Sequence, residues 1–357
     1  MVPSHYTWNQ KRQPRNETDS MFTFALHKAA STLKVTGWAW ANNEHRAITM
    51  IRPSFRSVSW RALLALVCAP SFCTAQDLEP RRWTHLPVGT NVLGVGYAFT
   101  SGDLGFDPVL DIQDAQVEMQ TGSVSYTRYF ALAGRTARID AIVPVQSGRW
   151  EGLLSGAPRS VARDGLADPV VRLSANLVGA PALSGKEFAD FRKEHSVQTS
   201  VGAAVEVRLP LGEYQEDKLI NLGQNRFAIA PQLGVLHTVG EWSFELTGSM
   251  IFFTDNNEFF NGNQLEQDPL YAAQAHVVKT FGQDWWMAAG AAYSWAGESK
   301  VNGVSKDDDK SNLIYGASFG YRIDASQSVR LAYVRTDTLN ELGADTDSVA
   351  VGWSFRF

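Results

Sequence analysis

From about residue 90 to residue 357, hydrophobic and polar residues alternate with a period of two. This period predicts β-strands, because successive side chains of a strand point to opposite faces, whereas a helix repeats about every 3.6 residues. The last segment alternates most clearly, and the residues expected on its apolar face are Val349, Val351, Trp353, Phe355 and Phe357. Similar alternation in 171–177, 197–209 and 311–322 predicts an all-β protein.

We predict twelve strands, most of which have the roughly 9–11 residues, or slightly more, that a tilted strand needs to cross a bilayer. They lie near residues 91–100, 116–131, 136–147, 166–178, 197–210, 225–238, 241–254, 270–281, 284–296, 311–323, 327–337 and 346–357. No apolar stretch reaches the roughly 18 residues of a membrane-spanning helix.

The expected connections alternate between short and long along the chain. The short ones fall at 133–135, 239–240, 282–283 and 324–326, and the long ones at 101–115, 148–165, 211–224, 255–269, 297–310 and 338–345. Outer-membrane barrels have this arrangement, with short periplasmic turns and longer external loops. The sequence therefore predicts a closed antiparallel transmembrane β-barrel of about 12 strands. A soluble all-β sandwich is the main structural alternative.

A membrane sheet must close, because unpaired backbone groups at an edge find no hydrogen-bond partner in hydrocarbon. An even number of strands places both ends of the barrel on the periplasmic side. Aromatic residues gather at the predicted strand ends, as expected for the two girdles at the membrane interfaces. They are Trp242, Phe252, Phe253, Trp285, Trp286, Trp295, Trp353 and Phe357.

One connection, 179–196, should be periplasmic and is nevertheless long. Ser184 and Glu187 have the spacing of a capping box, and Phe188 and Phe191 would share one helical face. The sequence predicts a short periplasmic helix or a partial plug over 182–194.

Residues 50–75 have the features of a secretory signal peptide in the expected order. Three arginines precede a short apolar run over 62–69, and small residues before Gln76 resemble a cleavage site. A buried hydrophobic helix is the alternative interpretation.

The stretch 1–49 is polar and has no sustained periodicity. Because a secretory signal normally begins its chain, we expect translation to start at Met50 and 1–49 to be an upstream extension outside the protein. Residues 76–357 would then form the barrel. A genuine extension, with Trp38 and Trp40 as its most distinctive residues, is the alternative.

Charge is distributed unevenly between these parts. Of 32 Lys and Arg and 37 Asp and Glu, nine basic and three acidic side chains lie in 1–75, which leaves 23 basic and 34 acidic for the rest. An acidic body argues against nucleic acid as a partner, since phosphate binding needs clustered Lys and Arg. Cys68 and Cys73 precede Gln76, so the expected mature chain can form neither an internal disulfide nor a thiolate metal site.

Five stretches are less generic than an alternating strand: LADPVVRLSANLVGAPALS (166–184), INLGQNRFAIAPQLGVLH (220–237), FFTDNNEFF (252–260), QDPLYAAQAHVVKTF (267–281) and VNGVSKDD (301–308). Together they resemble a bacterial outer-membrane family named after the meta-cleavage pathway of phenol degradation, whose members are often called transporters. The resemblance covers roughly 83–357. It implies an outer-membrane barrel that passes small hydrophobic or aromatic compounds, and it supplies no catalytic residues.

Charged side chains expected on the inward face are the candidate selectivity residues, because lumen residues tune which solute passes. They are Arg138, Asp140, Arg172, Glu206, Arg208, Glu245, His276, Arg322, Arg330 and Arg356. The alternative is that these charges pair across a narrow lumen and hold the barrel together. The excess of arginines would give a weak preference for anions or phenolates.

An enzyme is the less favoured class of function. Some outer-membrane barrels are hydrolases, but the sequence has no H-E-x-x-H and no phosphate-binding loop. Ser249 and His276 fall on neighbouring predicted strands, where contact is conceivable. His276 is more simply explained as a hydrogen-bonded lumen histidine, and we expect no cofactor and no metal ion. A structural or adhesive barrel without transport is a third class.

The expected partners are outer-membrane lipid and lipopolysaccharide, a small-molecule solute and the outer-membrane assembly machinery. Trp353, Phe355 and Phe357 suggest the last of these, because a terminal aromatic at this spacing resembles the C-terminal signal that the machinery reads. In the alternative, Phe357 is only a girdle aromatic.

Overall fold

The computed structural model describes residues 78–106, 112–340 and 342–357. The expected signal peptide at 50–75 and the upstream stretch 1–49 lie outside the described residues. Within the described ranges, no helix is both long enough and apolar enough to cross a membrane.

The described residues form strands and one helix. These elements are β1 (Asn91–Gly105), β2 (Ile112–Leu132), β3 (Arg135–Leu154), β4 (Ala157–Leu166), β5 (Val170–Val178), α2 (Gly185–Glu194), β6 (Val197–Arg208), β7 (Ala228–Val239), β8 (Trp242–Phe253), β9 (Asn256–Phe259), β10 (Asn263–Gln267), β11 (Leu270–Phe281), β12 (Trp285–Ala296), β13 (Ser299–Val301), β14 (Val304–Ser305), β15 (Lys310–Arg322), β16 (Gln327–Thr338) and β17 (Gly343–Arg356).

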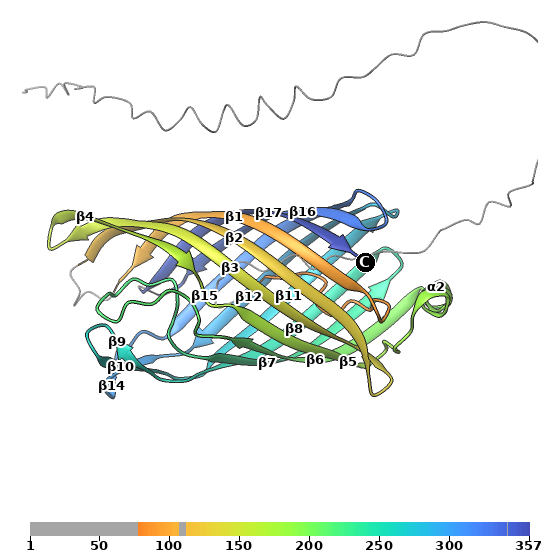
Figure 1. Cartoon of the computed structure of the whole chain (residues 1–357), viewed down its shortest axis with the longest axis horizontal. Helices are drawn as coiled ribbons and strands as arrows, with labels where there is room; N and C mark the ends of the chain where they lie inside the picture. Colours follow the sequence, from red (N-terminus) through yellow and green to blue (C-terminus); the bar gives the residue numbers. More distant parts are fainter. Residues whose placement is uncertain (1–77, 107–111, 341) are drawn as a thin grey trace, which may run out of the picture. The chain divides into compact units, whose positions relative to one another are not determined.

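The long strands close into a twelve-stranded antiparallel barrel, in which β4 and β5 together occupy one position (Figure 1). Each strand pairs with its neighbours in sequence, and β1 closes the ring by pairing with β17. The seam runs from the pair Val92 and Arg356 to the pair Gly105 and Gly343. The predicted fold class is therefore confirmed, and no barrel edge is left open at the seam.

Several predicted long loops are wrong in extent. The stretch 148–165 is mostly a hairpin of β3 and β4, turned at Ser155 and Gly156 with positive φ angles of 51° and 76°. The stretches 101–115 and 338–345 are largely continuations of strands, and β9, β10, β13 and β14 form a second small sheet within the long connections. These segments extend past the membrane-spanning part, where water can lie on both faces, so their sequences lack the alternation that marks the wall.

The predicted strand 166–178 is interrupted at Ala167, Asp168 and Pro169. Pro169 has no backbone N–H to donate to a neighbouring strand, and β5 begins directly after it. On one side of this break β4 pairs with the far end of β3, and on the other β5 pairs with β3 and β6.

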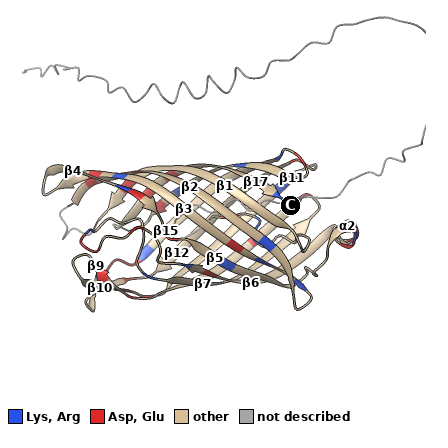
Figure 2. Ribbon diagram, viewed as in Figure 1, with Lys and Arg blue, Asp and Glu red and all other residues tan. Residues whose placement is uncertain are grey.

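The two faces of the wall differ as the alternation predicts. On β17, Val349 and Val351 are about half exposed on the outer face, whereas Ala350 and Ser354 are buried on the inner face. Large apolar side chains lie on the outside of most barrel strands, and the ribbon between the ends carries few charged positions (Figure 2). This surface suits a hydrocarbon environment, so the barrel is an outer-membrane protein.

Two residues assigned to the aromatic girdles face the lumen instead. Arg81 lies over the ring of Trp286, 5.2 Å from its centroid, and Phe253 packs against the buried cluster of Ala228, Ile251 and neighbouring residues. The period of two explains the correction, since adjacent residues such as Phe252 and Phe253 must point to opposite faces.

The expected helix is present as α2, at the same end of the barrel as the C-terminus (Figure 1). Ser184 is its N-cap residue, but its side chain makes no capping hydrogen bond, so the predicted capping box is not formed. Gly185 has a φ of +50°, which turns the chain into the helix at a residue without a Cβ atom.

We expect Val351→Arg to destabilise the folded barrel by about 2–4 kcal/mol, because it places a charge in hydrocarbon near the midplane. Urea titration of the protein in lipid vesicles measures this loss. Ser348→Arg on the opposite face of β17 is the matched control and should cost less. If the two variants cost the same, the assignment of the faces of β17 would be wrong.

Candidate functional site: the lumen and its plug

Residues 78–90, here called the lumen segment, fold back into the barrel before β1 begins. Trp83 and Leu86 are among the most deeply buried side chains of the described structure, at 2% and 1% exposure. At the root of the segment, the N–H of Asn91 donates to the carbonyl of Phe357, which fixes β1 against the C-terminus. The segment thus enters from the end that carries the short turns, the periplasmic end of an outer-membrane barrel.

Glu245 of β8 holds the backbone of the lumen segment. Its carboxylate accepts the backbone N–H of Arg81 at 2.6 Å and that of Trp83 at 3.2 Å. The segment makes no strand pairing there, so a wall carboxylate satisfies two buried N–H groups that would otherwise lack partners.

The ring of Trp83 packs against the wall at two glycines, where no side chain fills the space. A Cβ atom at Gly202 of β6 or at Gly234 of β7 would lie 2.2 Å or 1.9 Å from atoms of the Trp83 ring. The indole N–H donates to the hydroxyl of Thr247 at 2.8 Å. The two glycines therefore form a slot for one particular ring.

A buried cluster of ions joins the lumen segment to β3 and β5. Glu79 lies 2.8 Å from Arg172, 3.4 Å from Arg82 and 3.8 Å from Arg138. Asp140 lies 3.0 Å from Arg138 and 3.2 Å from Arg172, and it also accepts a hydrogen bond from a threonine of β2. With Glu206 3.8 Å from Arg172, three arginines meet three carboxylates.

The lumen segment supplies one of these three carboxylates. Burial raises the pKa of Glu79, but the positive charges of Arg172, Arg82 and Arg138 outweigh burial and hold that pKa well below its ordinary value. Glu79 is therefore a carboxylate at neutral pH, and it is the carboxylate that lies within 4 Å of all three arginines of the cluster.

Near the periplasmic end, His85 anchors the segment. Its Nε2 donates to the carbonyl of Pro181 at 2.8 Å, and its Nδ1 lies 3.3 Å from the amide nitrogen of Gln198. The rings of Phe188 and Phe191 on α2 meet the imidazole edge-on, at centroid distances of 4.9 and 5.4 Å. The helix thus packs against the base of the plug, while residues 78–90 fill the lumen.

The structure gathers some of the predicted selectivity residues and separates others. Arg138, Asp140, Arg172 and Glu206 belong to the ion cluster around Glu79. They bond along the wall and to the lumen segment, whereas the alternative interpretation had these charges pair across a narrow lumen. Their influence on solute choice stays a prediction.

The remaining predicted residues lie at other levels of the barrel. Glu245 and His276 stand opposite each other on β8 and β11, and both are buried. Arg322 pairs with Asp284 at 2.8 Å, near a short turn. Arg330 donates a hydrogen bond to the hydroxyl of Ser318, and Arg356 donates one to the carbonyl of Ala325. Arg208 lines the inner cavity of the lumen.

Ser249 and His276 do not form a nucleophile and base pair. The register places Ser249 opposite Ala272, four residues along β11 from His276. At about 3.3 Å per residue, four residues span roughly 13 Å, well beyond hydrogen-bond reach.

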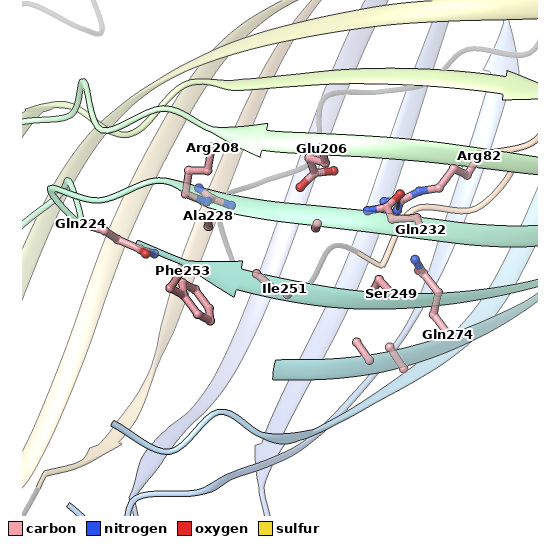
Figure 3. A pocket seen from close by; sticks show the side chains of 13 residues that line it. Arg82, Glu206, Arg208, Gln224, Ala228, Gln232, Ser249, Ile251, Phe253 and Gln274 are labelled. Carbon is pink, nitrogen blue, oxygen red and sulfur yellow. Dashed lines mark hydrogen bonds between the residues drawn. The ribbon is translucent and has the colours of Figure 1, made fainter. Parts of the chain in front are cut away.

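Two small cavities lie beside the lumen segment in the described structure. The inner cavity, lined by Arg82, Arg208, Gln232 and Gln274 among others, has a volume of about 40 Å³ (Figure 3). A second cavity, near the periplasmic turns beside His85, has about 90 Å³. One water molecule occupies about 30 Å³ of the liquid, so these spaces hold a few waters and not an aromatic ring.

Sequence reasoning missed the lumen segment, because residues 78–90 show neither the period of a strand nor that of a helix. The available signals were weak. One was the cluster of charged and aromatic residues soon after the expected cleavage site, namely Glu79, Arg81, Arg82 and Trp83. The other was the pair of glycines on the inner face of the wall, Gly202 and Gly234.

The barrel, its outward apolar band and its internal plug define a plugged outer-membrane β-barrel. The profile of the family described as "Putative MetA-pathway of phenol degradation" matches residues 98–343, well over half of the chain. The protein therefore belongs to that family, as the resemblance in the sequence implied.

A solved structure shows the same fold. The chain is similar to the COG4313 outer membrane channel from Pseudomonas putida F1, with a TM-score of 0.64 and 20% identity over 79% of this chain and 100% of that one. More distant matches include the translocator domain of the autotransporter NalP from Neisseria meningitidis (TM-score 0.42, 12% identity, 77% and 91% of the chains) and the CymD monoaromatic hydrocarbon channel (0.38, 8%, 76% and 89%). No curated protein sequence matches.

We predict that Glu79→Gln loosens the lumen segment and raises ion conductance in planar bilayers. Removing one partner of a buried ion pair costs about 3–5 kcal/mol, because the other charge stays buried and uncompensated. Glu216→Gln, in an exposed loop, is the matched control and should leave conductance unchanged. Equal conductance of the wild type and Glu79→Gln would contradict the role given to this carboxylate.

We also predict that acid weakens the docking of the lumen segment. Burial lowers the pKa of His85 to about 4, a lowering that the nearby Arg192 increases and the hydrogen bond to Pro181 opposes. The undocked histidine binds a proton near its ordinary pKa of about 6.5. Docking is therefore at full strength above pH 6.5 and weakens as the pH falls toward 4.

Conductance should accordingly rise between pH 7 and pH 4.5 in the wild type. His85→Gln cannot take up this proton, so it should show a flatter profile over the same range. Glu79 loses its charge only below this window, because its pKa is also lowered. The same rise in both proteins would exclude His85 as the cause.

Proposed function

We propose that the protein carries small hydrophobic or aromatic compounds across the outer membrane, and that the lumen segment shifts during passage. The observation that supports this most directly is the difference in cavity volume between the middle of the barrel and its end with the long loops. The two cavities described beside the lumen segment have volumes of about 40 and 90 Å³, whereas an apolar cavity of about 380 Å³ lies at the end with the long loops.

This contrast argues against a general porin. Porins for hydrophilic solutes keep a water-filled lumen, and here buried ions and Trp83 occupy that space. An apolar mouth instead concentrates molecules that leave water readily. Family membership points in the same direction, because the family is described by phenol degradation.

We propose no enzymatic activity. Ser249 lies far from His276, and His276 itself stands opposite Glu245 among groups that hold the plug. The selectivity role of the wall arginines, and the weak preference for phenolates that they would give, remain part of this proposal.

The proposal also includes partners beyond the solute. Trp353, Phe355 and Phe357 stack along the outer face of β17, at ring-centroid distances of 6.3 and 5.8 Å. In this proposal the assembly machinery reads the terminal stripe while the backbone edge of β17 is still unpaired with β1. The exposed apolar band would contact lipid and the acyl chains of lipopolysaccharide.

Uptake of N-phenyl-1-naphthylamine by intact Gram-negative cells tests the transport proposal, since this apolar dye fluoresces once it has passed the outer membrane. We expect several-fold faster uptake in cells that produce the protein than in cells that carry an empty vector. Purified protein in liposomes should meanwhile give no swelling with arabinose.

Arabinose flux would indicate a general porin. Unchanged dye uptake together with no arabinose flux would indicate a structural or adhesive barrel. Either result would overturn the proposed function.

A further inference from the structure

An apolar cavity lies at the end of the barrel that carries β4 and β9, opposite α2 and the C-terminus (Figure 1). Residues from six parts of the chain line it, among them Phe106, Trp150, Val161, Leu219, Ile220 and Phe260. Its volume of about 380 Å³ falls in the range of small-molecule sites, roughly 300–1,000 Å³. We call it the outer cavity.

The outer cavity belongs to the lumen side of the wall. Trp150 has the same parity along β3 as Arg138 and Asp140, which face the lumen, and β3 has no bulge between them. Val161 of β4 stands directly opposite Trp150. A molecule in this cavity is therefore at the entrance of the barrel and not on its lipid surface.

A long loop, 209–227, forms one wall of the cavity, and buried polar groups hold it in place. Asp168, 2% exposed, accepts the backbone N–H of Gly212 at 2.9 Å and that of Gln224 at 2.8 Å. Asn256, 1% exposed, donates to the hydroxyl of Tyr214 at 2.9 Å and to the carbonyl of Gln224. These bonds fix a segment that has no secondary structure of its own.

The anchored loop presents two apolar residues to the cavity. Leu219 and Ile220 line it and are half-buried, and Arg163 of β4 donates to the carbonyl of Ile220 at 3.0 Å. Lys218, in the same loop, also lines the outer cavity, and Gln224, six residues later, lines the inner cavity. One anchored loop thus borders both the entrance and the space above the lumen segment.

We propose that the outer cavity is a binding site for a single aromatic ring compound, which it takes up before transport. This inference rests on the proposed function and specifies the place and class of the ligand. Trp150, Phe106 and Phe260 offer rings that can meet a ligand ring edge-on or offset, and the aliphatic chains close the rest of the surface.

The chemistry of the lining argues for an apolar ring over other ligands. Charged residues that contribute to the cavity, such as Lys218 and Arg159, are largely exposed and lie at its rim. A sugar or an inorganic ion would lose its hydration without gaining buried hydrogen-bond partners. A ring with one polar substituent can bury its face and keep the substituent at the rim.

The test measures binding of 4-fluorophenol to the full chain in nanodiscs by ¹⁹F NMR, with empty nanodiscs as the reference for lipid partitioning. The wild type should give a saturable change in the ¹⁹F signal beyond that reference. Leu219→Glu should lower the affinity at least tenfold, because it places a carboxylate in the cavity. Val161→Glu, on β4 and not on the loop, should do the same.

Leu339→Glu is the matched control. It makes the same substitution at a leucine that is 60% exposed between β16 and β17, outside the cavity, and it should leave binding unchanged. All variants are compared at equal content of folded barrel, judged by heat-modifiable migration in gels. Loss of affinity in both cavity variants but not in Leu339→Glu would support the site.

Absence of saturable binding to the wild type would overturn this inference, as would unchanged affinity in the two cavity variants. The transport proposal fails by a different result, namely unchanged dye uptake by intact cells. Dye uptake without saturable binding would leave transport standing and remove the outer cavity as its binding site. Saturable binding without dye uptake would support the outer cavity as a binding site and overturn the transport proposal.

Discussion

The rest of the structure depends on the need to pair every backbone group of a sheet that lies in hydrocarbon. An unpaired edge costs several kcal/mol per group, so β1 and β17 must meet, and their pairing over most of both strands closes the ring. Closure with twelve strands fixes the circumference, since barrel diameter grows with strand number. Side chains of the wall do not fill a lumen of this width, and residues 78–90 occupy the remainder.

The lumen segment is held chiefly by polar groups. Glu245 binds its backbone, Glu79 completes a balanced cluster of ions, and His85 fixes its base. Buried ion pairs lose much of their attraction to desolvation, so their net contribution is small as long as all partners are present. This type of contact specifies one docked position without a large gain in free energy, as the proposed transport through the lumen requires.

The two ends of the lumen differ in chemistry. The middle and the periplasmic part hold arginines, carboxylates and two histidines, and the two cavities described there have the size of a few waters. The outer end holds a larger cavity, bounded by rings and aliphatic chains and by a loop that Asp168 and Asn256 anchor. An apolar solute would meet favourable surface first and then a polar barrier, so movement of the lumen segment would control its passage.

The sequence by itself determined the barrel and its two faces. Alternation such as that of Val349 and Val351 with Ala350 follows from the geometry of any strand between hydrocarbon and lumen, so a single chain segment reveals it. The wall positions of Arg138 and Asp140 were predictable for the same reason. Only the tertiary structure decided that Glu79 pairs with the wall charges. That contact joins residues 59 or more positions apart, and Glu79 lies in a segment without periodicity. Non-local contacts of this kind leave no regular pattern in the sequence, and the loop that completes the outer cavity depends on them as well.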